Sequence, residues 1–253
     1  MDTTSLSPER KMELGVIGTL IGMSCMGSFI QRVSGFGFGI FVMTVFPYLL
    51  PSYGEATALS GMLAASMSLV VAIRMRRFIE WHKVLPILAT FTVVSLGAVF
   101  IVSSIDQKLL KHVLGGILVA VSLYFFIFSE RIKLNPTLPA QIGLGTLSGL
   151  MGGLFAMQGP PAVLYFMASA QTKEKYIAQI QTYFVIGNLM MTLFRAEAGF
   201  VTLAVGMAYT YCLAAVALGA FVGGKVFKKL SAKVLRKIVY GYMAVSGIAA
   251  ILT

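Results

Sequence analysis

The sequence predicts an all-α membrane protein that crosses the bilayer many times, and three observations support this prediction. The mean hydropathy is +0.87. Hydrophobic residues make up 58% of the chain and charged residues 11%, whereas about a quarter of the residues in a soluble domain are charged. The net charge of +11 comes from basic residues in short gaps between apolar runs, where they set the membrane topology rather than bind nucleic acid.

Ten apolar runs are expected to form helices along the chain. A full crossing needs about 20 residues, so Gly159–Ala170 is too short and Ser34–Leu50 is marginal. Both follow breaks in the apolar pattern, and we expect them to be second arms of helical hairpins. The ten runs are Leu14–Gln31, Ser34–Leu50, Ala56–Ile73, Val84–Ile105, Leu109–Phe128, Leu138–Met157, Gly159–Ala170, Ile177–Phe194, Gly199–Gly224 and Val234–Leu252.

The second half of the chain resembles the first. Residues 18–22 (GTLIG) match residues 145–149 (GTLSG), and at the same offset Gln31 falls on Gln158 without a gap. Each copy holds five segments, and an odd number turns the second copy upside down relative to the first. We therefore expect two inverted repeats of five segments, each opening with a broken or re-entrant helical hairpin.

This reading divides the chain into a tail (1–13), a first repeat (14–128), a linker (129–137) and a second repeat (138–253). Lys and Arg fall 15 on one side of the predicted spans and 5 on the other. The asymmetry places the linker in the cytoplasm and both termini outside it. The tail lacks a signal-peptide pattern, so we expect the first run to be retained.

Two breaks in the apolar pattern form the candidate functional centre. The first is QRVSGFGFG (31–39) and the second is AMQGPP (156–161). Backbone that leaves a helix at membrane depth is tolerated where protein or a cavity covers it. Ser34 could cap one helix and the two prolines could start another, and helix N-termini attract anions. The alternative is that the glycines only ease packing and the prolines only mark a kink.

Further polar residues could complete an oxyanion site between the breaks. Arg32 is either an anion ligand or a cytoplasmic anchor. Gln181 and Asn188, seven apart, share a helix face and either line the cavity or bond to neighbouring helices. Arg195 and Glu197 are expected to form an interfacial pair, unless Arg195 attracts anions at the mouth. The candidate substrate-binding residues are Gln31, Arg32, Ser34, Gly35, Gln158, Gly159, Gln181, Thr182 and Asn188.

Several classes of function are not expected. No Asp or Glu lies in the middle of an apolar run, so a proton relay of the type found in pumps is not predicted. No spacing typical of a metal site, a catalytic nucleophile or a phosphate loop occurs. We expect no enzyme activity, no cofactor, no metal and no nucleic-acid partner. The expected partners are a small anion and the lipid bilayer, and a homodimer is compatible with this reading.

Glycines also recur at helical spacing, as in Gly18/Gly22, Gly145/Gly149 and Gly219/Gly223. Small residues four apart allow close helix contact in lipid, so we expect these pairs to serve packing rather than function.

The motifs resemble those of the TauE/SafE sulfite-exporter family. The shared features are the glycine-rich hairpin from Ser34 to Pro47, the second hairpin from Gly152 to Pro161, the segment Glu55–Ala58 and the basic loop Arg74–Lys83. The resemblance covers Gly15 to Thr253. It implies a multi-pass protein of the bacterial inner membrane, built of internal repeats, that moves sulfite, sulfonates or related organosulfur anions, generally outward.

The expected function is therefore a secondary transporter that works as an exporter of small sulfur-containing anions, by alternating access around a midplane site. This chain has Phe36 and Phe38 between its glycines and Pro160-Pro161 in the second hairpin, where the resembled family more commonly has consecutive glycines. These changes suggest an aromatic wall and leave room for an organic sulfonate or a carboxylate. An anion channel and a transporter of small carboxylates are the alternatives, and coupling to protons, to Na⁺ or to neither stays open.

Overall fold

The computed structural model describes residues 8–102, 104–128, 135–226, 241–242, 244–249 and 251–252. These residues form helices and connecting turns, with no strand among them. Five helices are long and apolar enough to cross a bilayer: α1 (Pro8–Ser34), α4 (Tyr53–Met75, continued by the 3-10 turn η2, Arg76–Phe78), α5 (Trp81–Val102), α9 (Lys173–Glu197) and α10 (Leu203–Val226). The others are α2 (Phe38–Val42), α3 (Phe46–Leu49), α6 (Gln107–Phe128), α7 (Leu138–Phe155) and α8 (Gly159–Ser169). The predicted all-α, polytopic class is confirmed.

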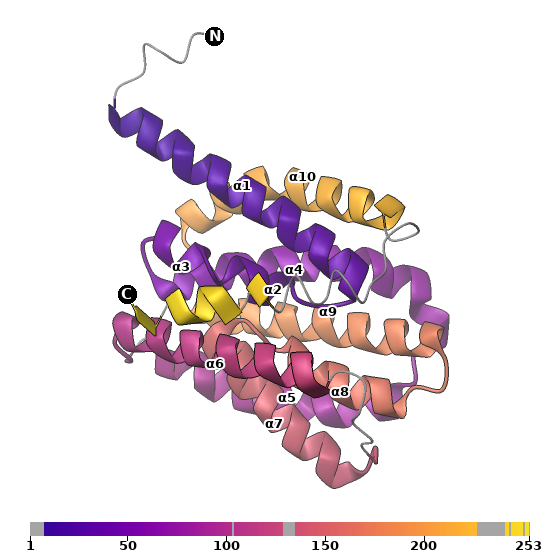
Figure 1. Ribbon diagram of the computed structural model, residues 1–253. Coiled ribbons are helices and arrows are strands. Elements are labelled where there is room, and N and C mark those ends of the chain that lie inside the picture. The colour runs from indigo at the N-terminus through magenta and orange to yellow at the C-terminus, as the bar shows by residue number, and fades with distance from the viewer. Residues whose placement is uncertain are drawn as a thin grey trace.

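The long helices pack in neighbouring pairs (Figure 1). Helix α1 lies against α10, α4 against α9, and α5 against α7. Because α10 also contacts α4 and α9 also contacts α5, the α4/α9 pair lies in the middle. This pair is antiparallel, since Glu80, beyond the end of α4, bonds to Lys175 in the first turn of α9. The short helix α2 packs against α4, and the short helix α8 packs against α9.

Matching caps begin the two central helices. The Ser52 hydroxyl accepts a hydrogen bond from the Glu55 backbone N–H at 3.1 Å, and the Thr172 hydroxyl accepts one from the Lys175 N–H at 3.2 Å. An N-cap oxygen satisfies one of the free amides of a helix start, and an acidic residue follows in the first turn of each helix. Local sequence thus fixes where α4 and α9 start.

The second arm of the first hairpin differs from the prediction. We expected one run over Ser34–Leu50, but the structure has α2 and α3 separated by a turn at residues 43–45. Pro47 lies in the first turn of α3, where its missing N–H costs nothing, and the Thr44 hydroxyl donates to the Phe41 carbonyl at 2.7 Å. Thr44 and Pro47 therefore divide the arm into two short helices.

Parts of the predicted scheme lie outside the described residues. These include most of the tail, linker residues 129–134 and residues 227–240, which contain the start of the tenth run. The described part of that run is helical, and the Tyr242 hydroxyl hydrogen-bonds to the Thr44 hydroxyl at 2.7 Å. This bond connects the last run to the first hairpin.

Glycines allow close contact in the two outer helix pairs. A Cβ on Gly219 of α10 would overlap the Cys25 carbonyl oxygen of α1, and a Cβ on Gly149 of α7 would lie 2.9 Å from the Phe91 carbonyl oxygen of α5. The packing role predicted for these glycines is confirmed. For Gly18 and Gly22 it is not found, because no atom of the described residues lies within 4 Å of an added Cβ at either position.

We predict that Gly219→Ala destabilises the protein by about 1–3 kcal/mol, because backbone on the opposite helix cannot move aside as a side chain can. Gly18→Ala is the matched control, since it adds the same methyl group to a helix at an open position. Thermal unfolding of both purified variants measures the difference. Equal unfolding temperatures would contradict the packing role.

Candidate functional site

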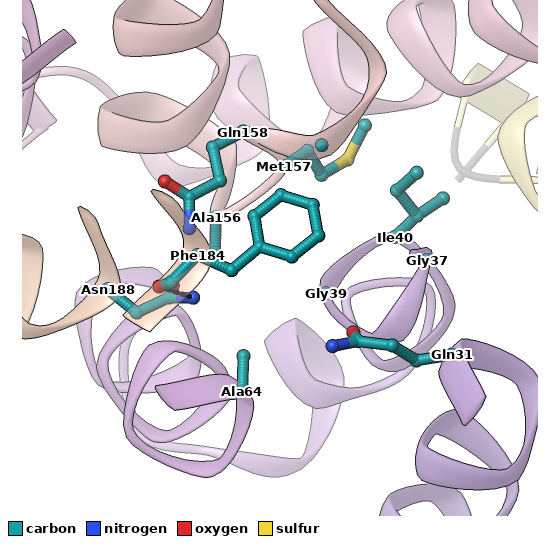
Figure 2. Close-up of a pocket in the computed structure, with 11 residues that line it drawn as sticks. Gln31, Gly37, Gly39, Ile40, Ala64, Ala156, Met157, Gln158, Phe184 and Asn188 are labelled. Atoms are coloured by element: carbon teal, nitrogen blue, oxygen red, sulfur yellow. Dashed lines mark hydrogen bonds between the residues drawn. The ribbon is translucent and has the colours of Figure 1, made fainter. Parts of the chain in front are cut away.

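The two predicted breaks meet in the interior of the protein. Gly39 of the first break lies so close to Ala156 of the second that an added Cβ would overlap the Ala156 carbonyl oxygen. Beside this contact is a cavity of about 30 Å³, which we call the central cavity. Figure 2 shows the side-chain amides of Gln31, Gln158 and Asn188 arranged around it. The lining residues are Gln31, Gly37, Gly39, Ile40, Ala64, Ala156, Met157, Gln158, Gly159, Phe184 and Asn188.

The first break depends on two glycines with positive φ angles. Gly35 has φ 90° and Gly37 has φ 108°, a region that residues with a Cβ rarely adopt. Gly37 is the N-cap of α2, whereas Ser34 is the last residue of α1. The prediction that Ser34 caps the helix after the break is therefore wrong, because three non-helical residues, 35–37, separate Ser34 from the start of α2 at Phe38. The side chain of Ser34 lies outside the described residues.

Gln31 holds the first break in place. Its side-chain oxygen accepts a hydrogen bond from the Phe38 backbone N–H at 3.2 Å, and its Nε2 donates to the Ser68 hydroxyl of α4 at 3.3 Å. Gln181 of α9 does the same from the other side, since its Nε2 donates to the Gly35 carbonyl at 3.2 Å. Both amides therefore position backbone, and Gln31 also lines the cavity.

The second break is held through its backbone. Helix α7 ends in a Schellman turn, in which Ala156 has φ 56° and the Met157 N–H donates to the Met151 carbonyl. The Ser148 hydroxyl donates to the Gln158 carbonyl at 2.6 Å and also contacts the Tyr183 hydroxyl at 2.7 Å. These bonds fix the main chain of Gln158 and leave its side chain unused.

The side-chain amide of Gln158 is buried and has no partner. Its Oε1 and Nε2 make no hydrogen bond with the described residues, although the residue is 4% exposed. Burying an unsatisfied polar group costs about 1–3 kcal/mol. Asn188 also lines the cavity, with its Nδ2 donating to the Phe184 carbonyl at 2.8 Å. The cavity thus has one amide that is free to bind a ligand.

The helix starts contribute less than the sequence suggested. Helix α2 has five residues, and the N–H of its first residue, Phe38, is taken by Gln31. Helix α8 begins at Gly159 and continues with Pro160 and Pro161, which have no N–H to offer. Side-chain amides, more than backbone amides, are the donors available to a ligand here.

A second cavity, of about 80 Å³, shares Gln31 with the first. Arg32, Gly35 and Gln181 line it. Arg32 is exposed, and its side chain lies along Gly223 and Gly224 at the end of α10. Eight of the nine predicted residues can therefore be placed. Gln31, Gln158, Gly159 and Asn188 line the central cavity, and Gln31, Arg32, Gly35 and Gln181 line the second. Buried Thr182 lines neither, and the ninth residue is Ser34, whose side chain is outside the described residues.

Sequence reasoning misplaced Arg195. It is 1% exposed, and its Nη2 donates to the carbonyls of Gly152 at 2.9 Å and Gly153 at 3.3 Å. Glu197 is exposed, so the predicted interfacial pair is wrong. A signal for burial was available, since Arg195 lies seven residues after Asn188 and thus continues the same helix face.

At the opposite end of α9, Glu80, which lies between two of the spans, forms a charged cluster. Its carboxylate contacts Lys175 at 2.8 Å and Lys83 at 2.9 Å, and Gln179 donates to it at 2.8 Å. Lys83 also donates to the Ser169 carbonyl at the end of α8. The hydrogen bonds from Lys175 and Lys83 lower the Glu80 pKa to about 2. The cluster connects the loop before α5 to α8 and α9.

We predict that this cluster stabilises the protein at neutral pH and loses its effect in acid. A carboxylate whose pKa is lowered in the folded state stabilises above its ordinary pKa, near 4.5, and the stabilisation falls as the pH drops towards about 2. Glu80→Gln should therefore unfold at a lower temperature than the unsubstituted protein at pH 7, with the difference shrinking below about pH 4.5. A difference that does not change with pH would contradict this assignment.

Comparison with known proteins finds one family that matches most of the chain. Residues 20–250 match the family model described as sulfite exporter TauE/SafE. The chain is also 24% identical over 246 residues to a protein of Cupriavidus necator named probable sulfite/organosulfonate exporter TauE, covering 92% of this chain and 93% of the relative. No solved structure matches. The chain therefore belongs to the sulfite exporter TauE/SafE family.

Proposed function

We propose that this protein is a secondary transporter that exports small sulfur-containing anions, such as sulfite or organosulfonates, through the central cavity. The observation that carries the proposal is the free, buried amide of Gln158 at the point where the two breaks meet. The family consists of exporters and not of enzymes. The name of the Cupriavidus necator relative supports sulfite and organosulfonates as the anion class.

The lining of the central cavity suits a small oxyanion. No acidic side chain is among the described residues that line it, and the amides of Gln31, Gln158 and Asn188 surround it. The NH₂ groups of Gln and Asn donate hydrogen bonds, and such bonds are stronger to a charged acceptor. Phe184 and Ile40 supply an apolar wall that would suit an organic group on a sulfonate.

The position of the cavity supports a binding site near the bilayer midplane. Ala64, which lines it, lies in the middle of α4 (Tyr53–Met75), and Phe184 and Asn188 lie in the middle of α9 (Lys173–Glu197). Both helices are long enough to span a membrane. A site at half their height is equally far from both faces, as alternating access requires.

The packing pattern supports two repeats of the same architecture. In chain order, α1 corresponds to α7, α4 to α9 and α5 to α10. The contact of α1 with α10 then corresponds to that of α7 with α5, and the contact of α10 with α4 to that of α5 with α9. The α4/α9 pair is its own counterpart. All of these contacts occur in the structure, and the caps at Ser52 and Thr172 correspond as well. With an odd number of segments in each repeat, one copy would be inverted.

The size of the cavity favours a carrier over a channel. A volume of about 30 Å³ has room for about two water molecules, since one water needs about 10–15 Å³ on this measure. An anion would enter only after the surrounding helices move, whereas a channel needs a continuous pore. We infer a location in the bacterial inner membrane from the family and the bacterial relative. The distribution of Lys and Arg supports an orientation with both termini outside the cytoplasm.

Counter-flow in proteoliposomes tests this function. Vesicles loaded with sulfite should take up labelled sulfite in a saturable manner, and external taurine or isethionate should compete. Anion conductance without exchange would instead support a channel. Competition by acetate or pyruvate but not by sulfonates would indicate a carboxylate transporter. Absence of both exchange and conductance would contradict the proposal.

A further inference from the structure

Arg195 is a buried cation that the central cavity does not use directly. It is 1% exposed, and its Nη1 is buried without a hydrogen-bond partner among the described residues. The ion pairs found in the described part of the chain both belong to Glu80. A buried charge with no counter-charge is costly, and a bound anion would offset that cost.

The unpartnered Nη1 of Arg195 lies next to residues of the central cavity. A Cβ on Gly61 of α4 would lie 3.0 Å from Nη1 and 3.8 Å from the Asn188 side-chain oxygen. Asn188 lines the central cavity, as does Ala64, which lies one helical turn from Gly61. The guanidinium is therefore about one turn away from the cavity, towards the start of α4.

Another unpartnered group lies at that same end of the central pair. Tyr53, the first residue of α4, is 1% exposed, and its buried hydroxyl has no hydrogen-bond partner in the part of the chain that the structure describes. Tyr53 lines a third cavity, of about 170 Å³, together with Gly54 and Phe200. Among the described residues, buried polar atoms without partners thus include those of Gln158 at the central cavity, Arg195 beyond it and Tyr53 at the third cavity. Other such atoms belong to Ser24, Glu55, Ser169, Gln179 and Thr182.

We propose that Nη1 of Arg195 is a second binding point for the transported anion, between the central cavity and the cavity at Tyr53. This proposal rests on the function proposed above and adds a specificity-determining residue to it. Nη1 offers two N–H donors to a sulfite, sulfonate or carboxylate oxygen. The carbonyls of Gly152 and Gly153 at the end of α7 hold Nη2, so the guanidinium is already oriented before the anion arrives.

Charge at this position is tested with Arg195→Gln and Arg195→Lys in the full-length protein. In sulfite counter-flow, we expect Arg195→Gln to raise KM by at least about tenfold and Arg195→Lys by less than about threefold, since lysine keeps the charge. The control is Arg74→Gln, at an exposed arginine in the last turn of α4, which should leave KM unchanged. A KM for Arg195→Gln within twofold of the unsubstituted protein, or an equal rise for both variants, would overturn the proposal.

A second variant keeps the arginine, because Arg195 also caps α7 and its loss could prevent folding. Gly61→Ala places a methyl group 3.0 Å from Nη1 and should hinder an anion from reaching it. We expect an increase in KM of about threefold or more with little change in kcat. Gly97→Ala in α5, where no described atom lies within 4 Å, is the matched control. An unchanged KM for Gly61→Ala would reject the binding point, whatever the folding of Arg195→Gln.

Sulfite binding measured by thermal shift separates this proposal from the transport function. If the unsubstituted protein exchanges sulfite and Arg195→Gln exchanges it with the same KM, the second binding point is rejected and the transporter stands. If the unsubstituted protein binds sulfite without exchanging it, the transport function fails, and the loss of that binding in Arg195→Gln still supports the second point. Absence of both binding and exchange would reject both proposals.

Discussion

Replacing Gln158 with alanine is expected to lower sulfite affinity by about 10- to 150-fold, the equivalent of one hydrogen bond to a charged group worth about 1.5–3 kcal/mol. Because both polar atoms of this side chain lack partners among the described residues, the substitution removes no hydrogen bond that the structure shows. Stability should therefore be unchanged or higher. Thermal unfolding without ligand, and the shift of the unfolding temperature with sulfite, measure the two effects.

Gln31→Ala provides the matched contrast. Gln31 occupies the corresponding position in the first half, but its amide is bonded to the Phe38 N–H and to Ser68. We expect this variant to lose stability even without ligand, by about 1–3 kcal/mol. If Gln158→Ala instead unfolded at a lower temperature and kept its affinity for sulfite, Gln158 would be a structural residue and the proposed site would be wrong.

Gly39→Ala should prevent the two breaks from meeting. The added methyl would overlap the carbonyl oxygen of Ala156, and backbone in a Schellman turn cannot shift without losing that turn. We expect a loss of about 3 kcal/mol or more, together with loss of sulfite exchange. The yield of monodisperse protein and the counter-flow rate are the measurements.

Gly206→Ala serves as its control, since this glycine of α10 has no described atom within 4 Å of an added Cβ. It should fold and exchange sulfite as the unsubstituted protein does. Normal stability and exchange in Gly39→Ala would mean that the contact between the breaks is not needed for function.

Much of the fold follows from local sequence. Hydropathy and length predict the long helices, and glycine and proline predict both breaks, because these residues act on their own backbone. The prediction was less exact where two signals compete within one run. In Ser34–Leu50, apolar character suggests one arm, while Gly37 and Pro47 each start a new helix.

The roles of individual side chains could not be predicted, because they depend on partners far away in the sequence. Gln31 and Gln158 occupy the same position when the two halves of the sequence are aligned. Of these two side chains, however, only that of Gln31 forms hydrogen bonds with described residues, namely with the Ser68 hydroxyl and the Phe38 backbone N–H. Arg195 lies near the end of an apolar run beside Glu197, which suggested an interface, and the carbonyls that bind it come from α7. Its spacing from Asn188 was the useful sign, since position on a helix face is a local property.

The exchange of partners between the two halves also has a consequence for biogenesis. Because α1 packs with α10 and α7 packs with α5, each half of the chain contains helices whose packing partners lie in the other half. During synthesis α1 is made long before α10, so it has no packing partner until α10 has been translated, and contacts between such distant segments form slowly. Assembly of this pair is therefore expected to finish only after α10 has entered the membrane, and a chain truncated before α10 should be a target for membrane quality-control proteases.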